Sequence, residues 1–175
     1  MDLKLYSGKD DSATSGPVLT SFKRYLRCPL GNAKCCCHQE LEVFAHGTQP
    51  MGKAKESFWC CVPSIDILKP DGTKEYMLSP PTCCGGMMVD CCAEGCCNCR
   101  IPIYIYVPGG SGATGTQIGK LVKVWAGLAN ELFTEAHTVE VEFPVDSSPD
   151  AKERILGGAL LMNQVFFGKD GGGGG

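Results

Sequence analysis

The chain has 175 residues, of which 43% are hydrophobic and 20% are charged, so it can bury a sizeable core within one domain. Its formal net charge of −3 at pH 7 argues against a protein whose main function is to bind nucleic acid, because contacts to phosphates require a basic surface. The composition therefore predicts a globular domain, which we place at residues 1–170. We expect the glycines at 171–175 to form a disordered tail.

The first half of the chain predicts short strands joined by tight turns. Residues 3–7 and 17–24 flank a Gly/Asp/Ser-rich turn and predict a hairpin. Residues 40–46 alternate as a half-buried strand, and the stretch 47–55 predicts a turn. This pattern is typical of an antiparallel meander.

Strand signals continue beyond residue 56. Residues 57–62 are a strand candidate, and 64–78 predict the clearest hairpin, which turns at Asp71-Gly72. Strand character returns at 101–107 after a cysteine- and glycine-rich stretch, at 119–125 after a glycine-rich loop, and at 138–143, which alternates strictly. A short helical turn or bulge is expected at 126–132.

One long helix is predicted, at residues 149–167. Ser148 can cap it, Pro149 fits the first helical position, and Asp150 places negative charge at the positive end of the helix dipole. Apolar residues surround the helix axis, which is the pattern of a helix buried on all sides. The expected core residues of this helix are Ile155, Leu156, Leu160, Leu161, Val165 and Phe166.

This helix is too short to span a membrane, because a spanning helix needs roughly 20 apolar residues. Gly157 and Gly158 are unfavourable inside a helix, so we expect them to allow close approach of a surrounding wall. The strand-rich remainder of the chain is the expected wall. The fold class predicted is therefore mainly β, with a barrel-like sheet around a buried C-terminal helix.

The chain contains 13 cysteines, most of them in adjacent pairs or in the triplet at 35–37. Residues 2–11 are polar and give no sign of a signal peptide, so we expect the thiols to be reduced and on the cytosolic side. Lipid attachment, metal binding and simple burial are the alternatives.

Several segments of the sequence resemble the phospholipid scramblase family. Arg27-Cys28 followed by the triplet Cys35-Cys36-Cys37 looks like the family's cysteine-rich palmitoylation segment. The stretches 119–128, 132–136 and 142–146 look like its C-terminal half, and the Gly/Ala/Leu-rich helix that ends in two phenylalanines also matches.

The resemblance implies a tubby-like fold, which is an antiparallel barrel threaded by its C-terminal helix. The sequence predicts eight or nine strands, fewer than the resemblance implies, so we expect the family's opening strands to be absent from this sequence. We therefore expect a smaller or incomplete barrel, or one completed by a neighbouring chain. Because exposed sheet edges are templates for pairing, a homo-oligomer formed through these edges is one expectation.

The resemblance implies acylation of Cys35, Cys36 and Cys37, with a buried or idle thiol cluster as the alternative. A second group of seven thiols offers C-x₄-C and C-x₂-C spacings on a glycine-containing segment, and four such thiolates would suit zinc. The alternatives for that group are further acylation and disulfides. Its members are Cys83, Cys84, Cys91, Cys92, Cys96, Cys97 and Cys99.

The stretch from Glu135 to Asp146 lies where the resemblance implies a calcium segment. Glu140 stands where the sharp turn of an EF-hand loop needs glycine, so a strand with outward Glu140 and Glu142 is the favoured interpretation. Weak surface calcium binding by Glu135, Glu140, Glu142 and Asp146 is the alternative.

The resemblance implies a membrane-associated protein on the cytoplasmic face of the plasma membrane or internal membranes. It would promote calcium-dependent, ATP-independent movement of phospholipids between leaflets. The second hypothesis is a non-catalytic adaptor of tubby-like fold that binds lipids or proteins and self-assembles. No spacing of histidine, serine and carboxylate residues indicates a hydrolase or a transferase.

Overall fold

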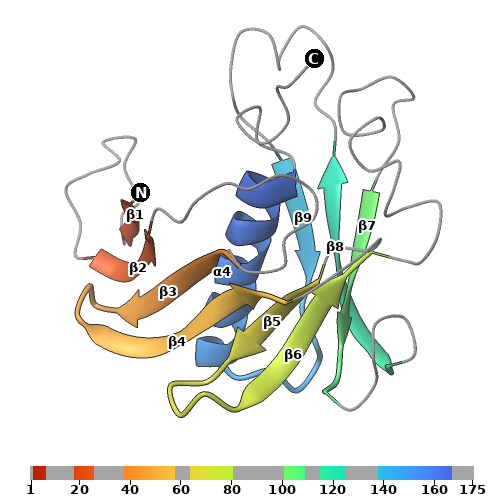
Figure 1. Ribbon diagram of the computed structural model, residues 1–175, viewed down its shortest axis with the longest axis horizontal. Helices are drawn as coiled ribbons and strands as arrows, with labels where there is room; N and C mark the ends of the chain where they lie inside the picture. The colour runs from red at the N-terminus through yellow and green to blue at the C-terminus, as the bar shows by residue number, and fades with distance from the viewer. Residues whose placement is uncertain are drawn as a thin grey trace, which may run out of the picture.

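The computed structural model describes residues 2–6, 18–25, 38–57, 64–80, 101–108, 115–124 and 138–166. Nine strands form one antiparallel sheet in which each strand pairs with its neighbours in the sequence (Figure 1). The elements are β1 (Asp2–Tyr6), β2 (Val18–Arg24), β3 (Glu40–Ala45), β4 (Gln49–Glu56), β5 (Ile65–Leu68), β6 (Lys74–Ser79), β7 (Ile101–Tyr106), β8 (Gln117–Val124), β9 (Thr138–Glu142) and the helix α4 (Pro149–Phe166).

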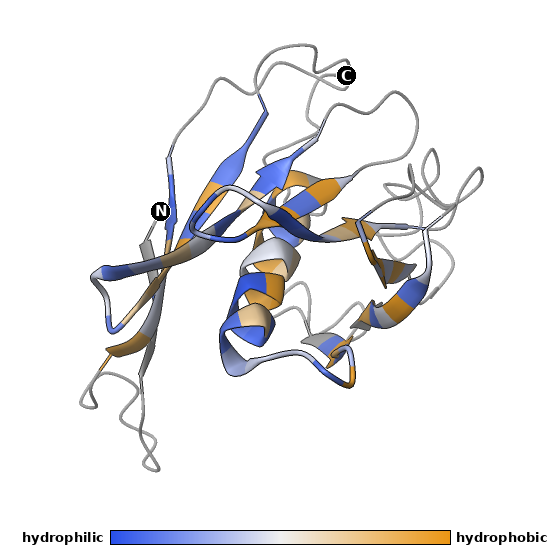
Figure 2. Cartoon of the chain, turned by 90° about the horizontal axis from the view of Figure 1, so that it is seen from below, coloured by the Kyte–Doolittle hydropathy of each residue, from blue (hydrophilic) through white to orange (hydrophobic). Residues whose placement is uncertain are grey.

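The sheet curls, and α4 lies on its concave side (Figures 1 and 2). The helix packs mainly against β3, β4 and β5, while β7, β8 and β9 continue the curve beside it. The predicted mainly β fold, an incomplete antiparallel barrel around a C-terminal helix, is confirmed. No described helix is long and apolar enough to cross a bilayer.

Strand alternation builds the core, because successive side chains of a strand point to opposite faces of the sheet. In β3, β5 and β7 buried apolar residues occupy alternate positions, and they belong to the same core cluster as the buried helix residues. Figure 2 shows that hydrophobic and hydrophilic residues interchange along the strands. Strand residues with 0% exposure include Val43 on β3, Ile65 and Ile67 on β5, Leu78 on β6 and Ile105 on β7.

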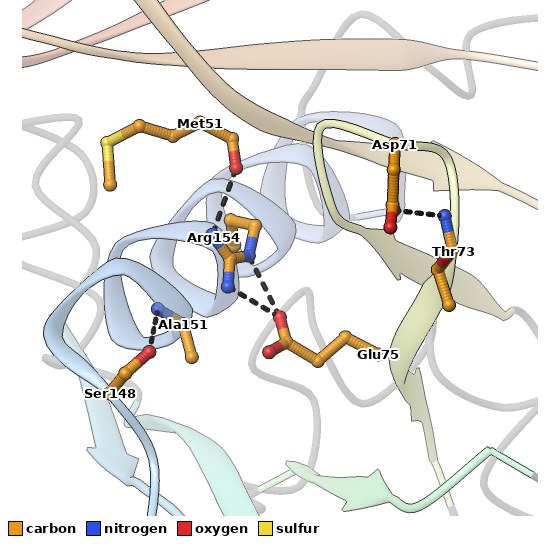
Figure 3. Close-up of polar contacts among 7 residues, drawn as sticks. All are labelled: Met51, Asp71, Thr73, Glu75, Ser148, Ala151 and Arg154. Carbon is orange, nitrogen blue, oxygen red and sulfur yellow. Dashed lines mark hydrogen bonds and ion pairs between the residues drawn. The ribbon is translucent and has the colours of Figure 1, made fainter.

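The helix begins as predicted. The Oγ atom of Ser148 accepts a hydrogen bond from the backbone N–H of Ala151 at 3.2 Å (Figure 3). Pro149 occupies the first helical position. One stripe of the helix is fully buried, and its spacing of three and four residues is that of a single helical face. The stripe consists of Ala151, Arg154, Ile155, Gly158, Leu161 and Met162.

The remaining faces of α4 are less deeply buried than expected. Leu156, Leu160 and Val165 are half-buried and pack against the edge of the core cluster. The described sheet wraps only part of the helix circumference, so burial on all sides holds only in part. The side chain of Phe166 lies outside the described residues.

The hairpin predicted at Asp71-Gly72 joins β5 to β6. Gly72 has a φ of 84°, a backbone conformation that favours glycine. The carboxylate of Asp71 accepts a hydrogen bond from the backbone N–H of Thr73 at 2.8 Å, and this bond lowers the pKa of Asp71 (Figure 3).

One element was predicted wrongly. The stretch 47–55, expected to be a turn, contains most of β4, and only residues near 46–48 turn the chain. Other predictions cannot be compared, because residues 58–63 and 125–137 lie outside the described residues.

Candidate functional site

The two glycines in the middle of α4 allow close packing against the sheet. A Cβ atom at Gly157 would lie 2.8 Å from Val43 Cγ2, and one at Gly158 would lie 2.5 Å from Ile67 Cδ1 and 2.6 Å from Leu78 Cδ1. These distances are shorter than van der Waals contact. Helix and sheet therefore approach as closely as the sequence predicted.

A buried arginine fastens the same helix to two strands (Figure 3). The guanidinium of Arg154 donates from Nε to Glu75 Oε2 at 2.9 Å and from Nη1 to the carbonyl oxygen of Met51 at 2.9 Å. Its Nη2 atom lies 2.8 Å from the same carboxylate oxygen. A Cβ atom at Gly52 would lie 2.7 Å from Arg154 Cδ, so the absence of a side chain there leaves room for the arginine.

The connections that contain the cysteines begin and finish at strand ends on the same side of the sheet. Residues 26–37, 58–63 and 81–100 connect β2 to β3, β4 to β5 and β6 to β7. In a meander, alternate connections leave the sheet at the same end. All 13 cysteines fall in these three connections, and we call this end of the sheet the cysteine end.

A layer of polar side chains lies at the cysteine end among described residues. Arg24, near the end of β2, donates to the side-chain oxygens of Gln164 on α4 and Gln39 before β3, each at 3.1 Å. The carboxylate of Glu56, which is 0% exposed, accepts the backbone N–H of Gln39 at 3.0 Å. We call these four residues the polar end cluster. They tie the last turns of the helix to the strand ends that bear the cysteine connections.

The predicted acylation and zinc residues cannot be placed. Cys35, Cys36 and Cys37 lie outside the described residues, and so do the seven cysteines of the segment 81–100. Their position in the chain still assigns them to connections at the cysteine end. Both ligand predictions stay predictions.

The predicted calcium residues fall partly within the described chain. Glu140 and Glu142 are exposed on β9, and Asp146 is exposed in the turn before α4. Glu135 lies outside the described residues. Among the residues that the structure does describe, no group of three or more His, Cys, Asp and Glu side chains is arranged to hold a metal ion.

Glu142 already has a cationic neighbour on the next strand. The ammonium group of Lys120 lies 2.9 Å from Glu142 Oε2 across the β8–β9 pair. The hydrogen bond to Glu142, together with its negative charge, raises the pKa of Lys120. Outward Glu140 and Glu142 agree with the strand interpretation of this stretch.

The polar residues that hold the helix were missed from sequence. Arg154, Glu75, Arg24 and Glu56 were not singled out, because each resembles an ordinary surface charge in its own segment. A detectable signal existed only for Arg154, which is three residues from Ala151 and four from Gly158 and so shares a helical face with these two small residues.

Comparison with known proteins identifies the family. The family model described as Scramblase matches residues 13–169, which is most of the chain. The chain belongs to the scramblase family. No solved structure shows a significant match to it.

The curated relatives are similar at low identity. Phospholipid scramblase 2 of Bos taurus is 28% identical over 155 residues, covering 87% of this chain and 47% of that protein. Phospholipid scramblase 1 of Homo sapiens is 26% identical over 161 residues, covering 87% and 43%. The human phospholipid scramblase family member 5 is 27% identical over 154 residues, covering 87% and 51%. This scramblase-family chain thus spans about half the length of the curated relatives it matches.

Proposed function

We propose that this chain is a membrane-associated, phospholipid scramblase-like protein that promotes movement of phospholipids in both directions between bilayer leaflets. The observation that carries the proposal is the family match over residues 13–169, together with relatives that are named phospholipid scramblases. The proposal includes activation by calcium and no requirement for ATP.

Attachment to the membrane would occur through the cysteine end. Acyl chains on Cys35, Cys36 and Cys37 would each add roughly 0.8 kcal/mol of membrane affinity per buried CH₂, and two chains suffice for stable anchoring. The three cysteine connections start and finish at strand ends on one side of the sheet, which supports a single membrane-facing end. The cytoplasmic leaflet is the proposed surface.

Calcium would act as a surface ligand and not as the ion of an enclosed protein site. Carboxylate oxygens are the ligands that calcium prefers, and Glu140, Glu142 and Asp146 are exposed. Such open carboxylates could share an ion with lipid phosphates, with Glu135 as a further proposed ligand. Zinc, proposed for the cysteines of 81–100, would have a separate, structural role.

The packing of the interior favours a second candidate function. Ile155, Leu161 and Met162 fill the concave side of the sheet with 0 to 1% exposure, so the space beside them is occupied by side chains. A polar lipid headgroup that crosses a bilayer needs a polar track. The second candidate is therefore a lipid- or protein-binding adaptor of the same fold.

A transport assay separates the two candidates. The 175-residue chain is reconstituted into vesicles that carry a fluorescent phospholipid in both leaflets, and accessibility of the inner-leaflet lipid is followed with calcium, with magnesium and with chelator. A scramblase exposes the inner-leaflet lipid, most rapidly with calcium. An adaptor binds the vesicles and leaves that lipid protected.

A further inference from the structure

The described sheet ends on two unpaired edges. β1 pairs only with β2, and β9 pairs only with β8, so the nine described strands do not close into a barrel. An open edge presents a row of unpaired backbone N–H and C=O groups, which favour addition of another strand. Both edge strands are 5 residues long.

Opposite charges occupy the centres of the two edges. Lys4 is the third residue of β1 and Glu140 is the third residue of β9, and both are exposed. Their neighbours across the sheet are uncharged, Ser21 for Lys4 and Val122 for Glu140. Within the described residues, neither side chain forms an ion pair, in contrast to Glu142 with Lys120.

We infer that two copies of this chain associate head to tail, with β1 of one copy paired to β9 of the next. Because Lys4 and Glu140 are central in strands of equal length, full overlap of the strands brings them opposite each other. The parallel orientation is the favoured one, because antiparallel overlap would also place Asp2 opposite Glu142, a pair of like charges. The partner is thus a second copy of the chain, and the interface is one continuous sheet.

Charge disfavours the symmetric alternatives. Full antiparallel overlap of two β9 strands would place Glu140 opposite its own copy, and overlap of two β1 strands would do the same with Lys4. Like charges directly opposite each other destabilise a strand pair, whereas opposite charges stabilise it. The heterologous pair is therefore the one that the charges favour, and repeated use of it builds a ring or a filament.

A charge-exchange experiment tests this inference independently of lipid transport. The 175-residue chain, kept fully reduced, is studied by sedimentation velocity over a range of concentrations. We expect wild-type chain to self-associate, and we expect Lys4→Glu and Glu140→Lys each to weaken association roughly tenfold. The double variant Lys4→Glu/Glu140→Lys restores the opposite charges, so its association returns to within about threefold of wild type.

Lys69→Glu is the matched control, because Lys69 is exposed in the β5–β6 turn, away from both edges. It should associate like wild type. Hydrogen exchange at low and high concentration gives a second readout, in which protection should rise in residues 2–6 and 138–142. A wild-type chain that stays monomeric, single variants that associate normally, a double variant without recovery, or protection confined to other segments would each overturn the inference.

Discussion

Arg154 on α4 binds Glu75 on β6 through two guanidinium nitrogens, at 2.9 and 2.8 Å, and both contacts reach the same carboxylate oxygen. The two side chains are only 7% and 14% exposed. The pair joins residues 79 positions apart in the sequence and holds the first half of the helix against the sheet. Because both charges are removed from water, each depends on the other for solvation.

Replacing Arg154 alone should strongly destabilise the domain. The variant Arg154→Met leaves Glu75 buried without its cation, and breaking such a pair costs about 3–5 kcal/mol of unfolding free energy. Urea unfolding followed by circular dichroism measures this change. The double variant Arg154→Met/Glu75→Met removes both charges and should recover most of the loss. A single variant that loses less than about 1 kcal/mol would mean that the pair behaves as an exposed ion pair.

Filling the gap at Gly158 should also destabilise the domain. In Gly158→Leu even the first added carbon would meet Ile67 and Leu78, which are both fully buried and have little room to move. Overpacking of this kind costs about 1–3 kcal/mol or more. Thermal unfolding should show a lower Tm.

The matched control for this change lies on the same helix. Lys152→Leu introduces the same side chain at an exposed position, so its Tm should stay near that of wild type. If Gly158→Leu and Lys152→Leu both had the Tm of the wild type, the close contact between the helix and the sheet at Gly158 would be contradicted.

The meander was predictable from sequence wherever alternation carried the burial signal. β4 was not, because its residues include Pro50, Gly52 and two lysines, and only Met51 and Ala54 are apolar. The structure explains the glycine: Gly52 has a φ of 131°, and a Cβ there would overlap the carbonyl oxygen of Leu68 and lie 2.7 Å from Arg154 Cδ. At that position the backbone of β4, and not an apolar side chain, lies against Arg154. The strand therefore lacks the alternation of apolar and polar residues by which a strand is predicted.

The polar contacts around the helix could not be predicted, because they join distant segments. Thr20 on β2 donates to Glu153 Oε2 at 2.6 Å, and Arg24 donates to Gln164, over separations of 133 and 140 residues. Spacing within one segment cannot reveal such partners. The cap at Ser148 was predictable, because the residues next to a helix start determine its cap. The close packing at Gly157 and Gly158 was predictable as well, because glycine is unfavourable inside a helix and two in succession indicate a packing role.

Membrane attachment should depend on the cysteine triplet. Changing Cys35, Cys36 and Cys37 together to alanine removes the proposed acyl chains, and the variant should move from the membrane fraction to the soluble fraction of lysed cells. Mass spectrometry of the wild-type chain should find thioester-linked acyl groups on this peptide. Unchanged sedimentation with membranes, or thiols free of acyl groups, would contradict the proposed anchor.

Metal removal should distinguish the roles of the other cysteines. If the segment 81–100 binds zinc through its thiolates, a chelator will lower the Tm more than a reductant does, because a ligand that binds only the native state stabilises it. If the segment contains disulfides instead, a reductant will lower the Tm more than a chelator does. Elemental analysis of protein purified without added metal provides the check, and less than about a tenth of an equivalent of zinc would exclude the metal site.

Transbilayer movement of phospholipid is the direct measure of the proposed scrambling activity. Vesicles labelled with a fluorescent phospholipid in both leaflets are treated with an impermeant quencher after the chain has been shown to bind them. We predict that, with calcium and without ATP, the quencher also reaches the label that began in the inner leaflet, and that magnesium does not replace calcium. If the inner label stays protected on vesicles that carry bound chain, as it does on protein-free vesicles, the chain does not scramble lipids.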